Sequence, residues 1–126
     1  MRIFIVGAGE VGTHIASSLG REGHDLVIIE RDPRKVAKLQ ASMDLMAVSG
    51  DGCNPLTLKE HKVGNADLFF AVSNDDSSNV LAALTARALG AERCVVRVGN
   101  PELGKNPLIR RDEQIIPLYP ERREPA

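Results

Sequence analysis

The sequence predicts an α/β fold in which a parallel sheet lies between two layers of helices, making three layers in all. Continuous apolar runs, such as residues 3–6 and 26–29, alternate with segments whose apolar residues recur every three or four positions. The first pattern is typical of strands buried on both faces, and the second of helices. Strands that alternate with helices through short loops imply right-handed crossovers. Six expected strands suit the doubly wound, Rossmann-type order 3-2-1-4-5-6, in which a ligand binds beyond the carboxyl ends of the strands.

The first half of the chain is expected to hold three strands and three helices. The expected elements are a strand at 3–6, a helix from Glu10 that Gly23 ends, a strand at 26–29, a helix after Asp32-Pro33, a strand at 45–49 and a brief helix from Asn54-Pro55 to about Lys62. An Asp or Asn followed by proline predicts a helix start, because the side chain caps free N–H groups and proline suits the first turn.

The second half is expected to hold the other three strands. The expected elements are a strand at 67–73, a helix to about Leu89 with an apolar face of Val80, Leu81, Leu84 and Ala88, a strand at 93–98, a weak helix at 103–111 and a strand at 114–118. Gly90 is expected to close the long helix, and Gly104 and Pro107 interrupt the weak one.

The composition indicates one soluble domain over residues 1–119, followed by a polar tail over 120–126. The net charge of −1 argues against a nucleic-acid partner. The two cysteines, Cys53 and Cys94, form no C-x-x-C pair and are expected to be free thiols in a reducing compartment. No signal-peptide pattern follows Met1, and no apolar run approaches the roughly 20 residues that span a bilayer. We therefore expect a cytoplasmic protein that does not itself insert into a membrane.

A Gly-x-Gly-x-x-Gly turn, residues 7–12, joins the first strand to the first helix and is the main sign of function. Gly7 permits the tight turn, Gly9 lets a phosphate approach the backbone, and Gly12 lets the helix pack closely on the strand. A pyrophosphate would then lie at the positive end of the helix. The alternative is a tight turn that binds nothing.

Glu30 ends the second strand about 20 residues after the turn, where an acidic residue accepts hydrogen bonds from the adenosine ribose. Its carboxylate would repel a 2′-phosphate, so NAD or an adenine nucleotide is expected in preference to NADP. Arg31 is expected to offset that preference, to lie over the adenine, or to remain a solvated charge.

Further candidate contacts follow the other strands. Asp51, Gly52 and Cys53 end the third strand, where adenine would lie. Ser73 and Asn74 follow the fourth, where the strand order reverses; helix capping is the alternative for residues 74–77. Arg97, in an otherwise apolar strand, is expected to pair with a phosphate or an acidic neighbour.

No set of residues with catalytic or metal-ligating spacing is evident, and the chain offers no second domain to hold a substrate. We therefore expect binding without catalysis.

These segments together resemble the nucleotide-binding N-terminal domain of the RCK/KTN (TrkA-N) family, cytosolic regulators of potassium channels and transporters. The resemblance rests on the glycine turn and on residues 27–32, 50–53, 71–79, 96–98 and 100–102. The stretch over 71–79 is the most specific part, because ordinary dehydrogenases do not carry it. In two departures from the family, Cys53 stands where Thr or Ser is usual and Gly99 where a polar residue is common.

The resemblance implies a ligand, an assembly and a set of contacts. The implied ligand is NAD(H), ATP, ADP or AMP, and the implied assembly is a homodimer or larger ring on a membrane potassium channel or transporter subunit, at the inner face of the cell membrane. The implied contacts are Gly7, Ala8, Gly9, Glu10 and Val11 to the pyrophosphate, Glu30 to the ribose, Asp51, Gly52 and Cys53 to the adenine, and Ser73, Asn74 and Arg97 to the far half of the nucleotide.

The sequence therefore predicts a non-catalytic regulatory subunit or domain of a potassium uptake or channel system, in which ligand exchange shifts the conformation and changes ion transport. Two alternatives stay open. One is a small NAD-dependent oxidoreductase or dehydrogenase fragment, and the other is a nucleotide-binding interaction protein unrelated to transport.

Overall fold

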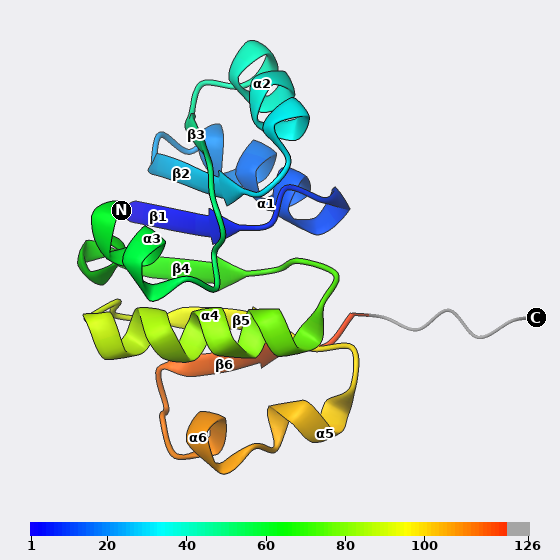
Figure 1. Ribbon diagram of the computed structural model, residues 1–126, viewed down its shortest axis with the longest axis vertical. Helices are drawn as coiled ribbons and strands as arrows, with labels where there is room; N and C mark the ends of the chain where they lie inside the picture. The colour runs from blue at the N-terminus through cyan, green and yellow to red at the C-terminus, as the bar shows by residue number, and fades with distance from the viewer. Residues whose placement is uncertain (121–126) are drawn as a thin grey trace, which may run out of the picture.

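Six parallel strands form one sheet in the order β3-β2-β1-β4-β5-β6, as the sequence predicts. The computed structural model describes residues 1–120. The strands are β1 (Arg2–Val6), β2 (Asp25–Glu30), β3 (Met46–Ser49), β4 (Leu68–Ala71), β5 (Cys94–Arg97) and β6 (Ile115–Leu118). All of their carboxyl ends point toward one edge of the sheet (Figure 1). The strand order reverses between β1 and β4 at that edge, which is where ligands bind in such sheets.

Helices cover both faces of the sheet. On one face lie α1 (Glu10–Gly20) and α2 (Pro33–Ser42); on the other lie α3 (Pro55–Glu60), the short 3₁₀ helix at Val63–Asn65 and α4 (Asp76–Leu89), in front of the sheet in Figure 1. The side chains of β1 alternate between the two layers: Ile3 and Ile5 join the apolar cluster under α1 and α2, and Phe4 joins the cluster under α4. Burial on both faces explains why β1 is apolar throughout.

The buried face of α4 differs from the predicted one. Leu81 is 52% exposed and Ala88 is also exposed, whereas Val80 and Leu84 are partly buried. The fully buried positions are Asn79, Ala82, Ala83 and Ala86. Both sets have helical spacing, so periodicity alone did not fix which one faces the sheet. Alanines at these positions let the helix lie close to β5, where the Cys94 thiol contacts the Ala83 carbonyl oxygen at 3.7 Å.

Two short helices replace the single weak helix predicted at 103–111. They are α5 (Pro101–Gly104) and α6 (Pro107–Arg110), and the side chains of Asn100 and Asn106 cap them. The Asn-Pro signal that correctly marks the start of α3 therefore recurs twice here. The first helix also ends earlier than predicted, at Gly20, although Gly23 has the expected positive φ of 79°. The predicted polar tail lies outside the described residues from 121 onward.

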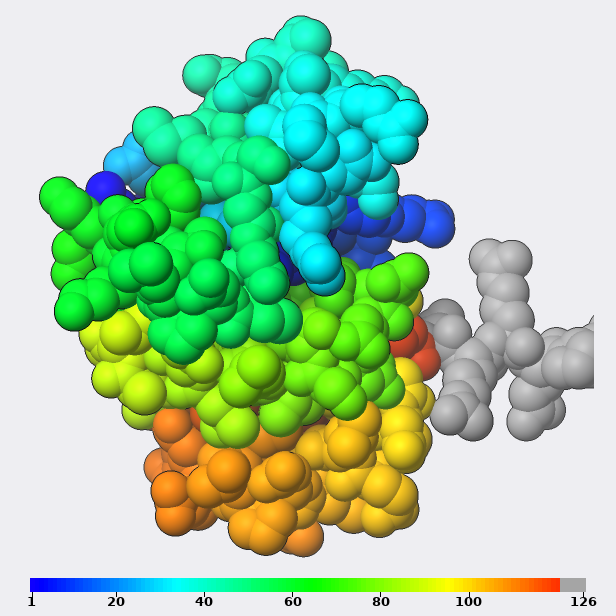
Figure 2. Space-filling view, viewed as in Figure 1, coloured from blue at the N-terminus to red at the C-terminus, as the bar shows by residue number. Residues whose placement is uncertain are grey.

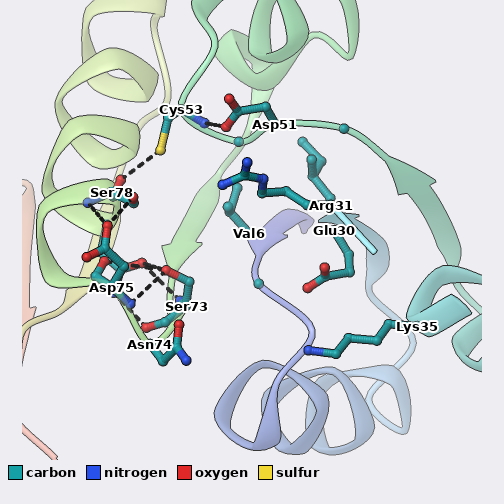
Figure 3. A pocket seen from close by; sticks show the side chains of 15 residues that line it. Val6, Glu30, Arg31, Lys35, Asp51, Cys53, Ser73, Asn74, Asp75 and Ser78 are labelled. Carbon is teal, nitrogen blue, oxygen red and sulfur yellow. Dashed lines mark hydrogen bonds between the residues drawn. The ribbon is translucent and has the colours of Figure 1, made fainter. Parts of the chain in front are cut away.

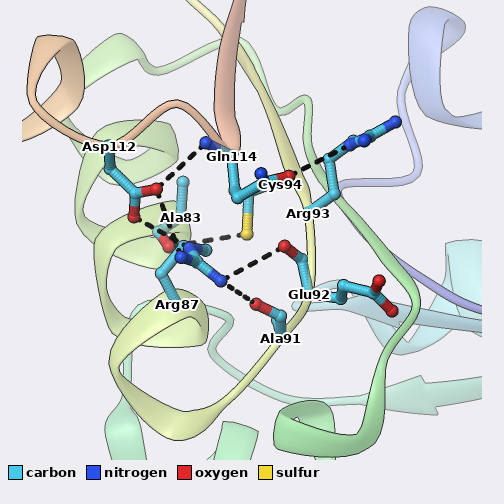
Figure 4. A network of polar contacts seen from close by, with 8 residues as sticks. All are labelled: Ala83, Arg87, Ala91, Glu92, Arg93, Cys94, Asp112 and Gln114. Atoms are coloured by element: carbon cyan, nitrogen blue, oxygen red, sulfur yellow. Dashed lines mark hydrogen bonds and ion pairs between the residues drawn. The ribbon is translucent and has the colours of Figure 1, made fainter.

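An ion pair fixes the carboxyl end of α4 to the loop before β6 (Figure 4). The Arg87 guanidinium donates to the two carboxylate oxygens of Asp112 at 2.8 and 3.2 Å, and to the Ala91 carbonyl at 2.7 Å. The hydrogen bond from Arg87 holds the pKa of Asp112 below its ordinary value. Burial raises the pKa of the adjacent Cys94 thiol to about 12, so this cysteine stays protonated at neutral pH.

Within residues 1–120, every helix is too short or too polar to cross a lipid bilayer.

Candidate functional site

A cavity of about 360 Å³ lies at the carboxyl ends of β1 to β4. It is bounded by the end of β1, by the residues after β2 and β3, and by the start of α4 (Figure 3). In the space-filling view, the segment after β2, coloured cyan, projects on the side that faces the viewer toward the green start of α4 (Figure 2). The cavity therefore lies at the reversal of strand order, where the sequence predicts the ligand.

The turn between β1 and α1 requires glycine at its first and last predicted positions. Gly7 has a φ of 103°, and a Cβ on it would lie 2.8 Å from the Ser73 nitrogen. A Cβ on Gly12 would lie 1.9 Å from the carbonyl oxygen of Gly7. Gly7 therefore allows the tight turn, and Gly12 allows close packing of the helix against it.

Gly9 differs, because a Cβ on it would meet no atom within 4 Å. This open side is where a phosphate could approach the backbone. Gly9 also gives α1 no side-chain cap, whereas the other α-helices within residues 1–120 are capped by Asp32, Asn54, Asp75, Asn100 and Asn106. The first-turn N–H groups of α1 are therefore left for water or an anion.

Two backbone donors hold the Glu30 carboxylate at the rim of the cavity. One oxygen accepts the N–H of Ala8 at 2.9 Å, and the other accepts the N–H of Asp32 at 2.7 Å. This arrangement links the end of β2 to the glycine turn and leaves lone pairs on the carboxylate for ligand hydroxyls. Figure 3 shows Arg31 extending into the cavity and the Lys35 ammonium pointing toward the glycine turn.

The loop after β3 forms the opposite wall. Asp51 accepts the N–H of Cys53 at 2.9 Å and so shapes the turn. A Cβ on Gly52 would lie 2.2 Å from a methyl carbon of Val6, so this residue lies against the end of β1. The Cys53 thiol donates to the Ser78 carbonyl oxygen at 3.4 Å and joins the loop to α4.

Asn79 is the one buried polar residue in the described part of the chain, and it joins the ends of β4 and β5. Its carbonyl oxygen accepts the Ser73 N–H at 2.9 Å and the Ser73 hydroxyl at 2.7 Å. Its amide donates to the carbonyl oxygens of Ser73 and Arg97, both at 2.9 Å. Every polar group of this side chain is therefore used within the protein.

Arg97 bonds to a backbone carbonyl oxygen rather than to an acidic neighbour, and the contact with a phosphate that the sequence suggests stays a prediction. The Arg97 guanidinium donates to the Ser73 carbonyl oxygen at 3.3 Å. Nearby, the Asp76 carboxylate accepts the N–H groups of Gly99 and Asn100 at 2.8 and 2.9 Å, which fixes the loop after β5 to α4.

The start of α4 is capped as the alternative interpretation of residues 74–77 suggests. Asp75 accepts hydrogen bonds from the N–H and the hydroxyl of Ser78. These bonds, the hydroxyl's above all, lower the pKa of Asp75. Asn74 remains exposed at the mouth of the cavity.

The fold brings most of the predicted site residues together. The predicted residues that line the cavity are Gly7, Glu30, Arg31, Asp51, Gly52, Cys53, Ser73 and Asn74. Ala8, Gly9, Glu10, Val11 and Gly12 form the adjoining turn and first helical turn, and Arg97 lies outside the lining.

Sequence reasoning missed Lys35, Ser78 and Asn79, which also line the cavity. The sequence does indicate that Asn79 is unusual, because it is a polar residue at the spacing of the buried alanines of α4. No sequence pattern distinguishes Lys35, because a lysine on an exposed helix is ordinary. Within residues 1–120, no group of His, Cys, Asp and Glu side chains is arranged to hold a metal ion.

Comparison with known proteins gives a family and a set of relatives. The TrkA-N domain family matches residues 3–112. A Trk system potassium uptake protein TrkA homolog from Archaeoglobus fulgidus is 41% identical over 110 residues, which cover 87% of this chain and 25% of the relative. One from Methanothermobacter thermautotrophicus is 32% identical over 102 residues, which cover 81% of this chain and 47% of the relative. The chain thus spans less than half the length of either relative.

Solved structures share the fold. The NAD(P)-binding domain of an exopolyphosphatase-related protein from Archaeoglobus fulgidus has a TM-score of 0.80 at 15% identity, covering 94% of this chain and 86% of that one. The GsuK channel bound to NAD has a TM-score of 0.77 at 21% identity, covering 91% of this chain and 21% of that one; GsuK has also been solved bound to ADP. Because the family match takes in the glycine turn, Glu30 and the whole cavity, the chain belongs to the TrkA-N domain family.

Proposed function

We propose that this domain binds an adenine nucleotide or NAD(H) and regulates potassium transport through a ligand-dependent change of conformation. One observation carries the proposal: the uncapped start of α1 lies beside a carboxylate that two backbone N–H groups hold in place. The helix start offers donors for phosphate, and the Glu30 carboxylate offers acceptors for ribose hydroxyls.

The residues present fit such a ligand in three respects. Gly9 leaves open space where a phosphate would lie, and Gly52 draws the wall after β3 close to β1. Arg31 and Lys35 add positive charge to the cavity lining. The same carboxylate that suits ribose hydroxyls disfavours a 2′-phosphate, which supports NAD or an adenine nucleotide over NADP. The GsuK channel, which shares the fold, binds NAD and ADP.

The transport role rests on the relatives, which are Trk system potassium uptake proteins. We infer that the partner is a membrane potassium channel or transporter subunit, reached from the cytoplasm, and that the domain acts as a homodimer or larger ring. The cavity supports binding without turnover. Among residues 1–120, no histidine lines it, and the hydroxyls of Ser73 and Ser78 donate to Asn79 and Asp75 of the protein.

The first experiment measures nucleotide binding by calorimetry with the wild-type chain and with Gly9→Val. The variant should fold, because a Cβ at Gly9 has open space, but it should lose binding because the side chain blocks the approach of phosphate. Gly20→Ala, at the other end of α1, is the matched control and should bind normally. Equal affinities of the Gly9→Val and wild-type chains would place the ligand elsewhere.

The second experiment addresses transport and catalysis. A tagged chain should co-purify with a potassium channel or transporter subunit from its native membranes, and nucleotide should alter that association. Mixed with NADH and common electron acceptors, the chain should leave the NADH unoxidised. Steady oxidation of NADH would instead favour an oxidoreductase.

A further inference from the structure

We propose that an amphipathic helix of a partner protein docks on the open face, the side of β5 and β6 that carries Val95, Ile116 and Leu118. Carboxylates beside the apolar stripe of that helix pair with Arg93 and Arg97. The inference concerns a protein partner and does not depend on a nucleotide in the cavity. It rests on an apolar row that the helices leave uncovered, on the width of the uncovered strip, and on two arginines without acidic partners.

One row of apolar side chains crosses all six strands on the side of α1 and α2. In order from β3 to β6, the row consists of Ala47, Ile28, Ile5, Phe70, Val95 and Ile116. Its first three members are at most 2% exposed in the cluster under α1 and α2. Phe70 and Val95 are only partly buried, and Ile116 is 43% exposed. The row therefore continues past the point where its helical cover ends.

Helices cover β5 and β6 on the opposite side only. Cys94, Val96 and Ile115, which alternate with the open-face residues, belong to the cluster under α4 and α6. In Figure 1, α1 and α2 lie beside β1 to β3, at the end of the sheet away from β6. Within residues 1–120, the open-face residues of β5 and β6 belong to neither apolar cluster. Two strands about 4.8 Å apart and the flank of β4 leave a strip about 10 Å wide, which is roughly the diameter of one helix.

Two arginines of this strip have no acidic partner. Arg93 and Arg97 lie two residues before and two residues after Val95, so strand alternation places them on the open face. Arg93 donates to the Gln114 side-chain oxygen at 3.4 Å, and Arg97 donates to the Ser73 carbonyl oxygen at 3.3 Å. Within residues 1–120, neither arginine forms an ion pair. They are about 13 Å apart along the strand, so carboxylates about nine residues apart on a helix would reach both.

The shape and charge of the open face favour a helix of another protein over a strand or a second copy. A strand would add at the edge of β6, where Pro117 has no N–H to donate, because the Leu118 carbonyl already faces β5 and accepts the Val98 N–H. A second copy offers no acidic match, since no helix within residues 1–120 contains two carboxylates. Two open faces related by a two-fold axis would set arginines against arginines. An apolar strip flanked by positive charge therefore suits an amphipathic helix with an acidic rim.

Two synthetic peptides of about 18 residues, long enough to pass both arginines as helices, test the inference by fluorescence anisotropy. Each forms one leucine stripe along a helix. One peptide carries glutamates about nine residues apart beside the stripe, and the other carries lysines at the same positions. The wild-type chain should bind the glutamate peptide at least about tenfold more tightly than the lysine peptide, because attraction to the two arginines replaces repulsion.

Three variants locate the bound peptide. Ile116→Asp should weaken binding of the glutamate peptide by at least about tenfold, because an apolar contact is lost and like charges meet. Leu108→Asp is the matched control: Leu108 is 44% exposed on α6, on the opposite side of the sheet, and its variant should bind as the wild type does. Arg93→Glu should shift the ratio of the two affinities by at least about fivefold toward the lysine peptide.

The outcomes separate this inference from the proposed function. Equal binding of the two peptides, or binding of neither, would overturn the acidic helix as partner. An affinity that Ile116→Asp leaves unchanged, or a preference that survives Arg93→Glu, would place the peptide elsewhere. A wild-type dimer that Ile116→Asp dissociates in sedimentation would show that the open face joins copies of this chain instead. None of these results bears on nucleotide binding, which Ile116→Asp should leave at the wild-type affinity.

Discussion

The two halves of the strand-end edge use their backbone polar groups in opposite ways. At the ends of β1 and β2, the start of α1 has no side-chain cap, and the Glu30 carboxylate lies beside it at a cavity. At the ends of β4 and β5, the available groups of Ser73, Asn79 and Asp76 already bond to one another or to the next loop. The first half leaves polar groups open beside a cavity, and the second half uses its polar groups within the protein.

This contrast teaches that topology alone does not define a binding site. The reversal of strand order brings both halves to one edge, as the fold class requires. Which half leaves its polar groups open depends on local chemistry: a glycine instead of an Asp or Asn at the start of α1, and a buried amide at the start of α4. Substitutions in the first half should mostly change affinity, except where packing is tight, and those in the second half should mostly change stability.

The largest effect is expected from Gly12→Ala, in the tightly packed part of the first half. The added Cβ would lie 1.9 Å from the Gly7 carbonyl oxygen, and backbone atoms cannot move aside without opening the turn. We expect a loss of about 3 kcal/mol in the free energy of unfolding, measured by urea denaturation. Gly20→Ala is the control, since its Cβ would lie 3.6 Å from a Leu26 methyl, an ordinary contact. Equal stabilities of the two variants would contradict the close packing of α1 on the turn.

The next effect is expected from Asn79→Ala, at the centre of the second half. The truncation leaves the Ser73 N–H and the Arg97 carbonyl oxygen without their partner. Unsatisfied buried groups of this kind cost about 1–3 kcal/mol, so the midpoint of denaturation should fall clearly. Asn74→Ala, an exposed neighbour, should stay within about 0.5 kcal/mol of the wild type. A neutral Asn79→Ala would show that the second half does not depend on this amide.

The sequence predicts the arrangement of the first half better than that of the second. In the first, the glycine spacing correctly predicts the tight turn at Gly7 and the close packing at Gly12, because these roles depend on local backbone geometry. Glu30 lies beside that turn, and its contact with a ribose stays a prediction. In the second, the partners of Arg97 and Asn79 come from residues distant in sequence, which no local pattern encodes. The buried face of α4 is predicted wrongly for a similar reason, because packing against the sheet determines which of two helical stripes is buried.

Glu30→Gln should have a moderate effect, confined to the first half. A glutamine can accept only one of the two N–H donors, and its amide would face the other. We expect nucleotide affinity to fall by about tenfold and the preference for NADH over NADPH to shrink, because the repulsion of a 2′-phosphate is removed. Titration with NADH and NADPH measures both effects. The exposed Glu60→Gln serves as the control, and an unchanged preference would remove Glu30 from ribose recognition.

The smallest effect concerns the far end of α4, where Arg87 and Asp112 fix the second half by charge. The hydrogen bond from Arg87 lowers the pKa of Asp112 in the folded chain. The pair therefore stabilises the protein above the ordinary carboxyl pKa of about 4, and this contribution is lost as the pH falls through the lowered value.

Asp112→Asn should reduce Tm at pH 6 by an amount that reflects about 1 kcal/mol, and the difference should shrink as the pH falls below about 4. Glu113→Gln, at an exposed neighbour, should show no such convergence. A difference between Asp112→Asn and the wild type that stayed constant down to low pH would mean that Asp112 acts through packing rather than through its charge.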